Sequence, residues 1–141
     1  MVEKKQDMIT AIVHTYNAEK HLRNVLEALK DFDEVLVIDN ESTDSTRSIA
    51  ESFSFVRFIT KPRDGFRYVE PHRQFGIEQA SNPWILEVDA DEIVPPALRN
   101  YLYEHIRQHP EPHGLLIPIK NYFMGKWMRC YYPDYILRLF P

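Results

Sequence analysis

Glycine is scarce in this sequence, and its scarcity excludes two common nucleotide-binding motifs. The chain of 141 residues contains 4 glycines, at positions 65, 76, 114 and 125. The G-x-G-x-x-G turn and the G-x-x-x-x-G-K phosphate loop both need glycines that lie much closer together. A diphosphate bound by this chain would therefore need a metal ion or arginine side chains to neutralise its charge.

The sequence also has little cysteine, no long apolar run and no excess of basic charge. Cys130 is the single cysteine, which excludes an internal disulfide and is typical of a reducing compartment. Charged residues interrupt every apolar run before the roughly 18 to 20 residues of a membrane span, and the start MVEKKQDMIT lacks a secretory apolar segment. The 17 Lys and Arg against 21 Asp and Glu argue against a dedicated nucleic-acid-binding protein. We therefore expect one cytoplasmic domain over residues 1–141, with no nucleic-acid partner.

Short apolar runs alternate with segments of helical periodicity along the chain. The apolar runs predict strands at residues 8–14, 35–38, 55–59, 84–88, 115–119 and 135–140. Helices are expected between them, at residues 22–29, 41–53, 71–80 and 96–108. Asn17 is expected to be the N-cap of the first helix. This order predicts an α/β fold, a mostly parallel, Rossmann-like sheet with helices on both faces. In such sheets ligands bind at the carboxyl ends of the strands.

Two carboxylates follow the predicted strand at 84–88, in the triplet Asp89-Ala90-Asp91. At a strand end the backbone can turn so that one carboxylate reaches a ribose and the other a metal ion. Hard oxygen ligands suit Mg²⁺ or Mn²⁺, which bridge a carboxylate to nucleotide phosphates. The alternative is a solvated acidic turn or a cap for the next helix.

A third carboxylate, Asp39, ends the predicted strand at 35–38. It can accept a hydrogen bond from a nucleobase N–H, such as the uracil N3–H. The alternative is a local turn or cap, and Ser42, Thr43 and Asp44 after it are interpreted as caps.

Three motifs follow predicted strands, in this order: Tyr16-Asn17-Ala18-Glu19, Asp39-Asn40-Glu41-Ser42-Thr43-Asp44 and Asp89-Ala90-Asp91-Glu92. Together they resemble the motifs of the inverting family 2 glycosyltransferases, which have the GT-A fold. The second motif departs from the family pattern at Asn40 and Glu41. The resemblance covers roughly residues 8–140. Residues 84–86, 89–92 and 133–140 bring it closer to the bacterial glucosyltransferases of lipopolysaccharide core biosynthesis, an activity of the cell envelope.

The resemblance implies roles for individual residues. Asp39 would bind the nucleobase, Asp89 the ribose, and Asp91 the divalent metal on the diphosphate. Arg73 matches the arginine of an Arg-Asn pair, with Gln74 in place of the asparagine, and would steady the diphosphate. Arg73 could equally be a surface charge on its helix. The donor-binding set that follows is Thr15, Tyr16, Asn17, Glu19, Asp39, Arg73, Asp89 and Ala90.

No catalytic base is assigned. Inverting transfer needs a general base for the acceptor hydroxyl, and in the family that acid follows the last strand predicted here. Glu92 and Asp134 are the nearest acids, but neither matches the base position. We therefore expect a truncated chain with the donor half of the site and the base beyond Pro141.

The expected activity is transfer of a sugar from a UDP-linked donor, with Mn²⁺ or Mg²⁺, to a glycan or lipid-linked acceptor. Two alternatives stay open: a non-catalytic nucleotide-sugar-binding domain, and a signalling domain whose acidic pocket binds metal without a nucleotide. Aromatic and basic residues between Tyr122 and Tyr132 predict either a peripheral contact with the inner face of the membrane or packing over the sheet.

Overall fold

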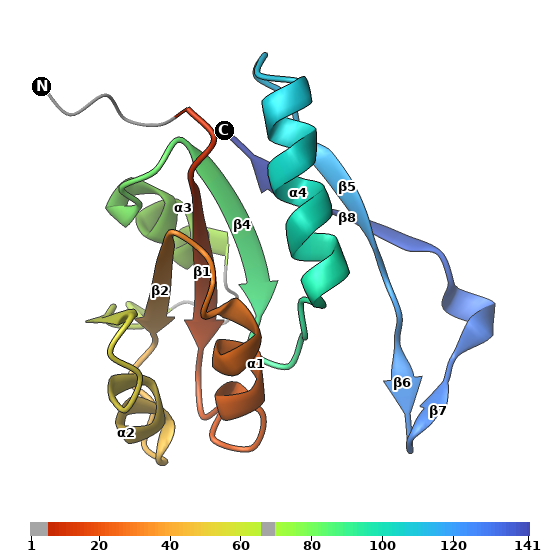
Figure 1. Ribbon diagram of the computed structural model, residues 1–141. Helices are drawn as coiled ribbons and strands as arrows, with labels where there is room; N and C mark the ends of the chain where they lie inside the picture. Colours follow the sequence, from red (N-terminus) through yellow and green to blue (C-terminus); the bar gives the residue numbers. More distant parts are fainter. Residues whose placement is uncertain (1–5, 66–69) are drawn as a thin grey trace, which may run out of the picture.

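A computed structural model describes residues 6–65 and 70–141 and contains one six-stranded sheet (Figure 1). The strand order is β3-β2-β1-β4-β8-β5. The pairs β1–β2, β1–β4 and β2–β3 are parallel, whereas β8 is antiparallel to both β4 and β5. The strands are β1 (Ile9–Thr15), β2 (Glu34–Asp39), β3 (Val56–Thr60), β4 (Trp84–Asp89), β5 (Leu115–Ile119) and β8 (Asp134–Phe140).

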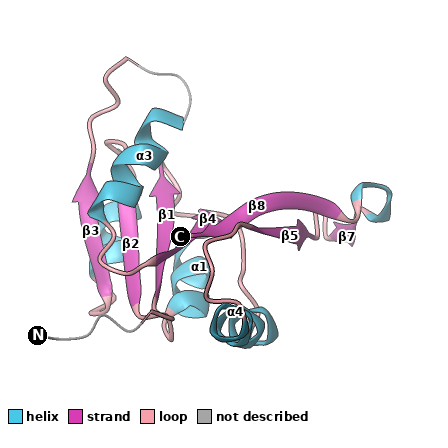
Figure 2. Cartoon of the chain, turned by 90° about the horizontal axis from the view of Figure 1, so that it is seen from above, coloured by secondary structure: helices cyan, strands magenta, loops and turns pink. Residues whose placement is uncertain are grey.

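Helices cover both faces of the sheet (Figure 2). One apolar cluster joins α1, α2 and α4 to one face, and a smaller cluster places α3 on the other. In α1 the residues Leu22, Val25, Leu26 and Leu29 are buried, which is the spacing of one helical stripe. The helices are α1 (Leu22–Leu29), α2 (Thr46–Glu51), α3 (Glu70–Gln79) and α4 (Pro96–Gln108).

Strand β1 is central and buried from both sides. Ile9, Ala11 and Val13 face the large cluster, and Ile12 faces α3. This burial explains why the strand has no polar alternation, as expected for a parallel strand with helices on both faces. The predicted α/β class, the mostly parallel sheet and the order of its elements are confirmed.

Some expectations are wrong in detail. Asn17 does not cap α1, because it lies in the left-handed region with φ 49° and the N-cap position is His21. A hairpin of β6 (Tyr122–Phe123) and β7 (Lys126–Trp127), followed by a short 3₁₀ helix at Arg129–Tyr131, was not predicted. The expectation that the first residues are not a secretory signal falls partly on residues 1–5, outside the described part.

The strand order puts β1 between β2 and β4, so three carboxyl ends lie side by side. In the register, Thr15 pairs with Asp39 and His14 pairs with Asp89. Strand order reverses at β1, and ligands of open α/β sheets bind at such a switch point. No helix within residues 6–65 and 70–141 combines the length and apolarity needed to cross a bilayer.

Candidate functional site

Asp39 is buried at the end of β2, with 3% of its surface exposed. Its Oδ1 accepts hydrogen bonds from the Thr15 hydroxyl and the Ser42 hydroxyl, both at 2.6 Å, and its Oδ2 accepts one from the Ser42 amide at 2.9 Å. The carboxylate therefore links the end of β1 to the loop that follows β2. One lone pair on Oδ2 is left for a further donor.

Reciprocal hydrogen bonds join residues 17–19, after β1, to residues 42–46, after β2. Backbone amides of each segment donate to side chains of the other, so the two loops hold one another in place. Asn17 and Glu19 each take part through both backbone and side chain. The bonds run from Asn17 N to Ser42 Oγ, Ala18 N to Thr46 Oγ1, Glu19 N to Asp44 Oδ2, Thr43 N to Asn17 Oδ1, and Ser45 N to Glu19 Oε2.

These contacts change the interpretation of Ser42 and Thr43 as local caps. Ser42 keeps a local turn contact, because it donates to Asp39 three residues earlier. Ser42 and Thr43 also bond to Asn17, 25 and 26 residues away. Asp44 does have the local role, because its Oδ1 accepts the Thr46 amide at 2.9 Å. Tyr16 is exposed beside these loops, with the Arg63 guanidinium 4.2 Å from its ring centroid.

Asp89, at the end of β4, is held by two arginines. Arg138, only 5% exposed, donates from Nη1 and Nη2 to the two carboxylate oxygens at 3.3 and 2.9 Å. Arg73 Nη2 lies 3.6 Å from Oδ1. Burial alone would raise the pKa of Asp89, but the Arg138 hydrogen bonds and the charges of Arg138 and Arg73 hold it below its usual range.

Glu92 closes the turn after β4. Its Oε2 accepts the Asp89 amide at 3.0 Å, and its Oε1 accepts Arg138 Nη2 at 2.6 Å. Burial raises the pKa of Glu92, with a smaller contribution from the charges of Asp89 and Asp91. Both oxygens are engaged within the protein, so the geometry gives Glu92 a supporting role.

Asp91 differs from both neighbours, because its carboxylate is exposed and makes no hydrogen bond or ion pair within the described part of the chain. Residues 6–65 and 70–141 contain no group of three His, Cys, Asp or Glu that could hold a metal ion. An uncommitted carboxylate suits Mg²⁺ or Mn²⁺, because such ions are commonly bound by one or two carboxylates together with substrate phosphates. The residues therefore fit a cation that arrives with a phosphorylated ligand.

Arg73 lies on α3 and reaches toward the end of β4. Its Nη1 donates to Glu87 Oε2 at 3.2 Å, while its side chain stays one-third exposed (34%). Two carboxylates flank the guanidinium, so Arg73 is a paired charge at the surface of its helix rather than an isolated one.

A groove of about 1050 Å³ opens beside these residues. Its lining includes Asp89, Asp91 and Arg138 together with apolar residues of β5, β8 and the loop before α4. Asp134 also lines it, with Asn121 Nδ2 donating to its Oδ2 at 3.3 Å.

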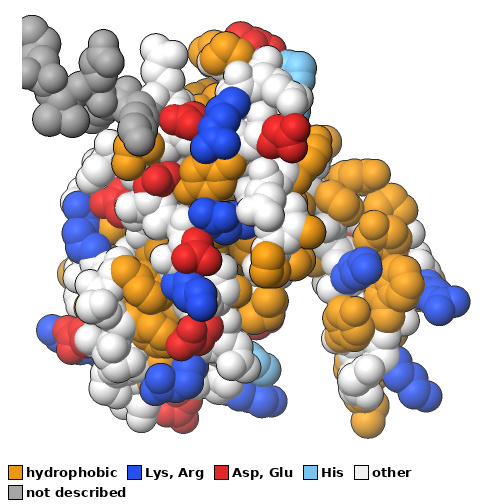
Figure 3. All heavy atoms as spheres, viewed as in Figure 1, with side chains coloured by type: hydrophobic (Ala, Val, Ile, Leu, Met, Phe, Trp, Pro, Cys, Tyr) orange, Lys and Arg blue, Asp and Glu red, His pale blue; other side chains and the backbone are white. Residues whose placement is uncertain are grey.

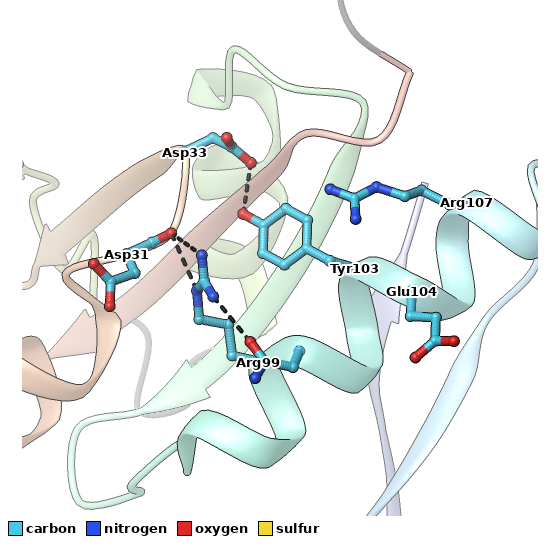
Figure 4. Close-up of a pocket in the computed structure, with 7 residues that line it drawn as sticks. Asp31, Asp33, Arg99, Tyr103, Glu104 and Arg107 are labelled. Atoms are coloured by element: carbon cyan, nitrogen blue, oxygen red, sulfur yellow. Dashed lines mark hydrogen bonds between the residues drawn. The ribbon is translucent and has the colours of Figure 1, made fainter.

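A second cavity, of about 470 Å³, lies at the opposite end of the sheet (Figure 4). The cavity lies at that end because Asp33, which lines it, directly precedes β2, whereas Asp39 of the candidate site ends the same strand. The Tyr103 hydroxyl donates to Asp33 at 2.6 Å, and Arg99 donates to the Asp31 carbonyl. Burial and the neighbouring Asp33 raise the pKa of Tyr103. Because these groups satisfy one another and join α4 to the sheet, we place the functional site at the carboxyl ends of β1, β2 and β4, beside the larger groove.

Sequence reasoning missed the roles of Arg138 and Glu87. Arg138 was noted only as part of the segment 133–140, and its partner Asp89 is 49 residues away. Glu87 carried a visible signal, since it is the one charged residue inside the apolar run 84–88.

Comparison with known proteins identifies the family of this chain. Residues 10–129 match the family described as Glycosyl transferase family 2. Over 121 residues the chain is 31% identical to the lipopolysaccharide core biosynthesis glycosyltransferase LpsC of Rhizobium meliloti, covering 83% of this chain and 44% of that protein. The chain thus spans less than half the length of this relative.

Solved structures show the same fold. S. aureus TarS, residues 1–349, superposes with a TM-score of 0.72 at 24% identity, covering 93% of this chain and 47% of that one. The same protein in complex with UDP gives a TM-score of 0.67 at 28% identity, covering 84% and 37%. The mannosyltransferase PcManGT from Pyrobaculum calidifontis, in complex with GDP-Man and Mn²⁺, gives 0.62 at 23%, covering 80% and 35%. With a GT-A sheet, aspartates at its switch point and a family match over most of its length, this chain belongs to glycosyl transferase family 2.

Proposed function

We propose that this chain forms the donor-binding part of an inverting glycosyltransferase that uses a UDP-linked sugar and a divalent metal ion. The observation that carries the proposal is the contrast within one turn: Asp89 is neutralised by two arginines, whereas Asp91 is exposed and uncommitted. Such a pair suits a fixed contact to a sugar hydroxyl beside a metal ligand. The 28%-identical TarS structure holds UDP, which supports the choice of nucleotide.

Each polar group has a role in this proposal. Thr15, Tyr16 and Asp39 line the nucleobase pocket, with the last free lone pair of Asp39 accepting the uracil N3–H. Asn17 and Glu19 hold the walls of that pocket through the loop contacts described above. Asp89 and the Ala90 backbone bind the ribose, Asp91 binds Mn²⁺ or Mg²⁺, and Arg73 contacts the diphosphate. When bound, the cation supplies Lewis-acid stabilisation of the leaving diphosphate.

The reaction also needs a general base, and Glu92 does not serve as one, because both its oxygens are engaged by Arg138 and the Asp89 amide. We propose that the base lies outside residues 1–141.

The acceptor, a glycan or a lipid-linked glycan precursor, would enter the groove whose lining includes Asp91 and the apolar residues of β5 and β8. The relative LpsC, a lipopolysaccharide core biosynthesis enzyme, supports an acceptor of the bacterial envelope.

We further propose a cytoplasmic protein whose hairpin contacts the inner face of the membrane. Figure 3 shows hydrophobic and basic side chains on the arm that carries β6 and β7. Met124 lies at the hairpin tip, 87% exposed, with a left-handed backbone of φ 48° that an apolar residue seldom adopts. Residues 120–133 contain three basic residues and no acid. Aromatic and basic side chains together are typical of interfacial anchors.

Sedimentation with vesicles tests the membrane contact. Binding to phosphatidylglycerol-containing vesicles is expected for the wild type and should fall for a Phe123→Ser, Met124→Ser variant. The control is Tyr101→Ser, which removes an exposed aromatic ring on α4, away from the hairpin. Equal binding by all three proteins would exclude the hairpin as the anchor.

A thermal-shift experiment tests the donor site. UDP with Mn²⁺ should stabilise the chain by about 2.7 kcal/mol at a hundredfold excess over Kd, and UDP with EDTA should do so much less. GDP, dTDP and CMP, each with Mn²⁺, are the comparison ligands. A folded sample that no nucleotide stabilises would contradict the proposal.

A further inference from the structure

Glu87 is a buried carboxylate in the middle of β4. It is 4% exposed and lies on the face of the sheet that α3 covers, two residues before Asp89. An ionised carboxylate in such a place costs free energy unless a cation and hydrogen bonds compensate it.

The compensation at Glu87 is incomplete. Its Oε2 accepts one hydrogen bond, from Arg73 Nη1 at 3.2 Å, and its Oε1 has no hydrogen-bond partner in the described part of the chain. His14 Nε2 lies 3.4 Å from Oε2 without forming a hydrogen bond. Gly76 allows α3 to pack closely against β1, because a Cβ at that position would lie 3.2 Å from the His14 ring.

A carboxylate held in this way is a weak contributor to stability. Replacing buried ion pairs by neutral groups of similar size is often neutral or stabilising. Arg73 is partly exposed, so it would not be left as a buried unpaired charge if Glu87 were neutral. The geometry therefore points to a use for Glu87 other than folding.

The position of Arg73, which donates to Glu87, indicates what that role is. Two carboxylates flank its guanidinium. Nη1 lies 3.2 Å from Glu87 Oε2, and Nη2 lies 3.6 Å from Asp89 Oδ1. A guanidinium has five N–H donors, so donors remain that can face a ligand at the end of β4. We propose that Glu87 is a positioning residue that fixes Arg73 at the edge of the donor site, ready to bind the diphosphate. This inference rests on the proposed function.

The experiment compares wild type, Glu87→Gln, Arg73→Met and the double variant in the presence of Mn²⁺. The quantities measured are Kd for UDP by calorimetry, Kd for uridine by NMR titration, and Tm without ligand. Glu87→Gln should weaken UDP binding about tenfold, leave uridine binding unchanged and leave Tm unchanged or higher. Arg73→Met should weaken UDP binding at least as much, and adding Glu87→Gln to it should have little further effect.

Controls separate this role from a structural one. Glu34→Gln removes a mostly buried carboxylate at the amino end of β2, paired with Arg57, and should leave UDP binding unchanged. Glu87→Met serves as a second variant if Glu87→Gln does not fold. A wild type that does not bind UDP overturns the proposed function and this inference with it. Normal wild-type binding overturns the inference alone if Glu87→Gln keeps full UDP affinity, weakens uridine equally, or acts additively with Arg73→Met.

Discussion

Arg138 donates to both carboxylate oxygens of Asp89, at 3.3 and 2.9 Å, and thereby ties strand β8 to the turn that follows β4. The same guanidinium reaches Glu92 at 2.6 Å. One buried side chain thus fixes Asp89 of the proposed donor site and the supporting Glu92, from a strand that runs antiparallel to β4.

Arg138→Met should destabilise the fold. Breaking a buried pair costs about 3–5 kcal/mol, and the partial exposure of Asp89 lowers the expected loss to about 2–3 kcal/mol. Urea unfolding measures it. Arg107→Met is the matched control, because its exposed pair with Asp7 contributes about 0–1 kcal/mol. Equal losses in the two variants would contradict the role of Arg138.

Asp91→Asn and Asp89→Asn should affect UDP binding differently. Asp91→Asn removes the charge that binds a hard cation, so Mn²⁺-dependent UDP binding should largely vanish while metal-independent binding survives. Asp89→Asn should weaken binding with and without Mn²⁺, because a ribose contact does not depend on the ion. Calorimetry of each variant with Mn²⁺ and with EDTA decides. Exchanged patterns would reverse the two roles, and normal binding by both would leave only an acidic turn.

Asp39→Ala should lower stability as well as nucleotide affinity. Thr15 and Ser42 lose the acceptor of three hydrogen bonds, at a cost of about 1–3 kcal/mol without any ligand. UDP affinity should fall roughly ten- to a hundredfold while the ratio between Mn²⁺ and EDTA conditions stays the same. Unchanged UDP affinity in a folded variant would remove Asp39 from the nucleobase pocket.

Acid should destabilise the protein through His72. Burial lowers the pKa of this residue, and the nearby charges of Lys61 and His14 add to the effect. The unfolded chain therefore takes up a proton near pH 6.5 that the native state resists. Stability is full above about pH 6.5 and falls as the pH drops, by at most about 1.4 kcal/mol per pH unit for one proton. His72→Gln should flatten this dependence in urea unfolding between pH 8 and 5.5, and an unchanged slope would assign the effect elsewhere.

Residues 1–141 should bind the donor without transferring its sugar. The expected result is UDP-sugar binding by calorimetry together with no glycosylated product from any acceptor tested. Transfer by this chain would show that the base lies within it, and Asp134→Asn would then test the other acid near the site, which lines the groove.

The strands and helices could be predicted because each is a local pattern: an apolar run for β1 or β4, and a helical stripe for α1. The clustering of Asp39, Asp89 and Asp91 at one edge followed from the parallel order alone. The place of β8 between β4 and β5 could not be predicted, because residues 135–140 read equally well as a strand in other positions. The roles of Arg138 and Glu87 could not be predicted for a related reason, since tertiary packing brings Asp89 to Arg138 and Arg73 to Glu87.

The reciprocal bonds between residues 17–19 and 42–46 have a consequence for motion. Neither loop can open without breaking the contacts of the other, so the two should behave as one cooperative unit. In hydrogen exchange, the amides of Asn17, Thr43 and Ser45 should share one protection factor rather than fray separately. A pocket wall built in this way is ordered before any nucleotide arrives, which spares the entropic cost of ordering it on binding.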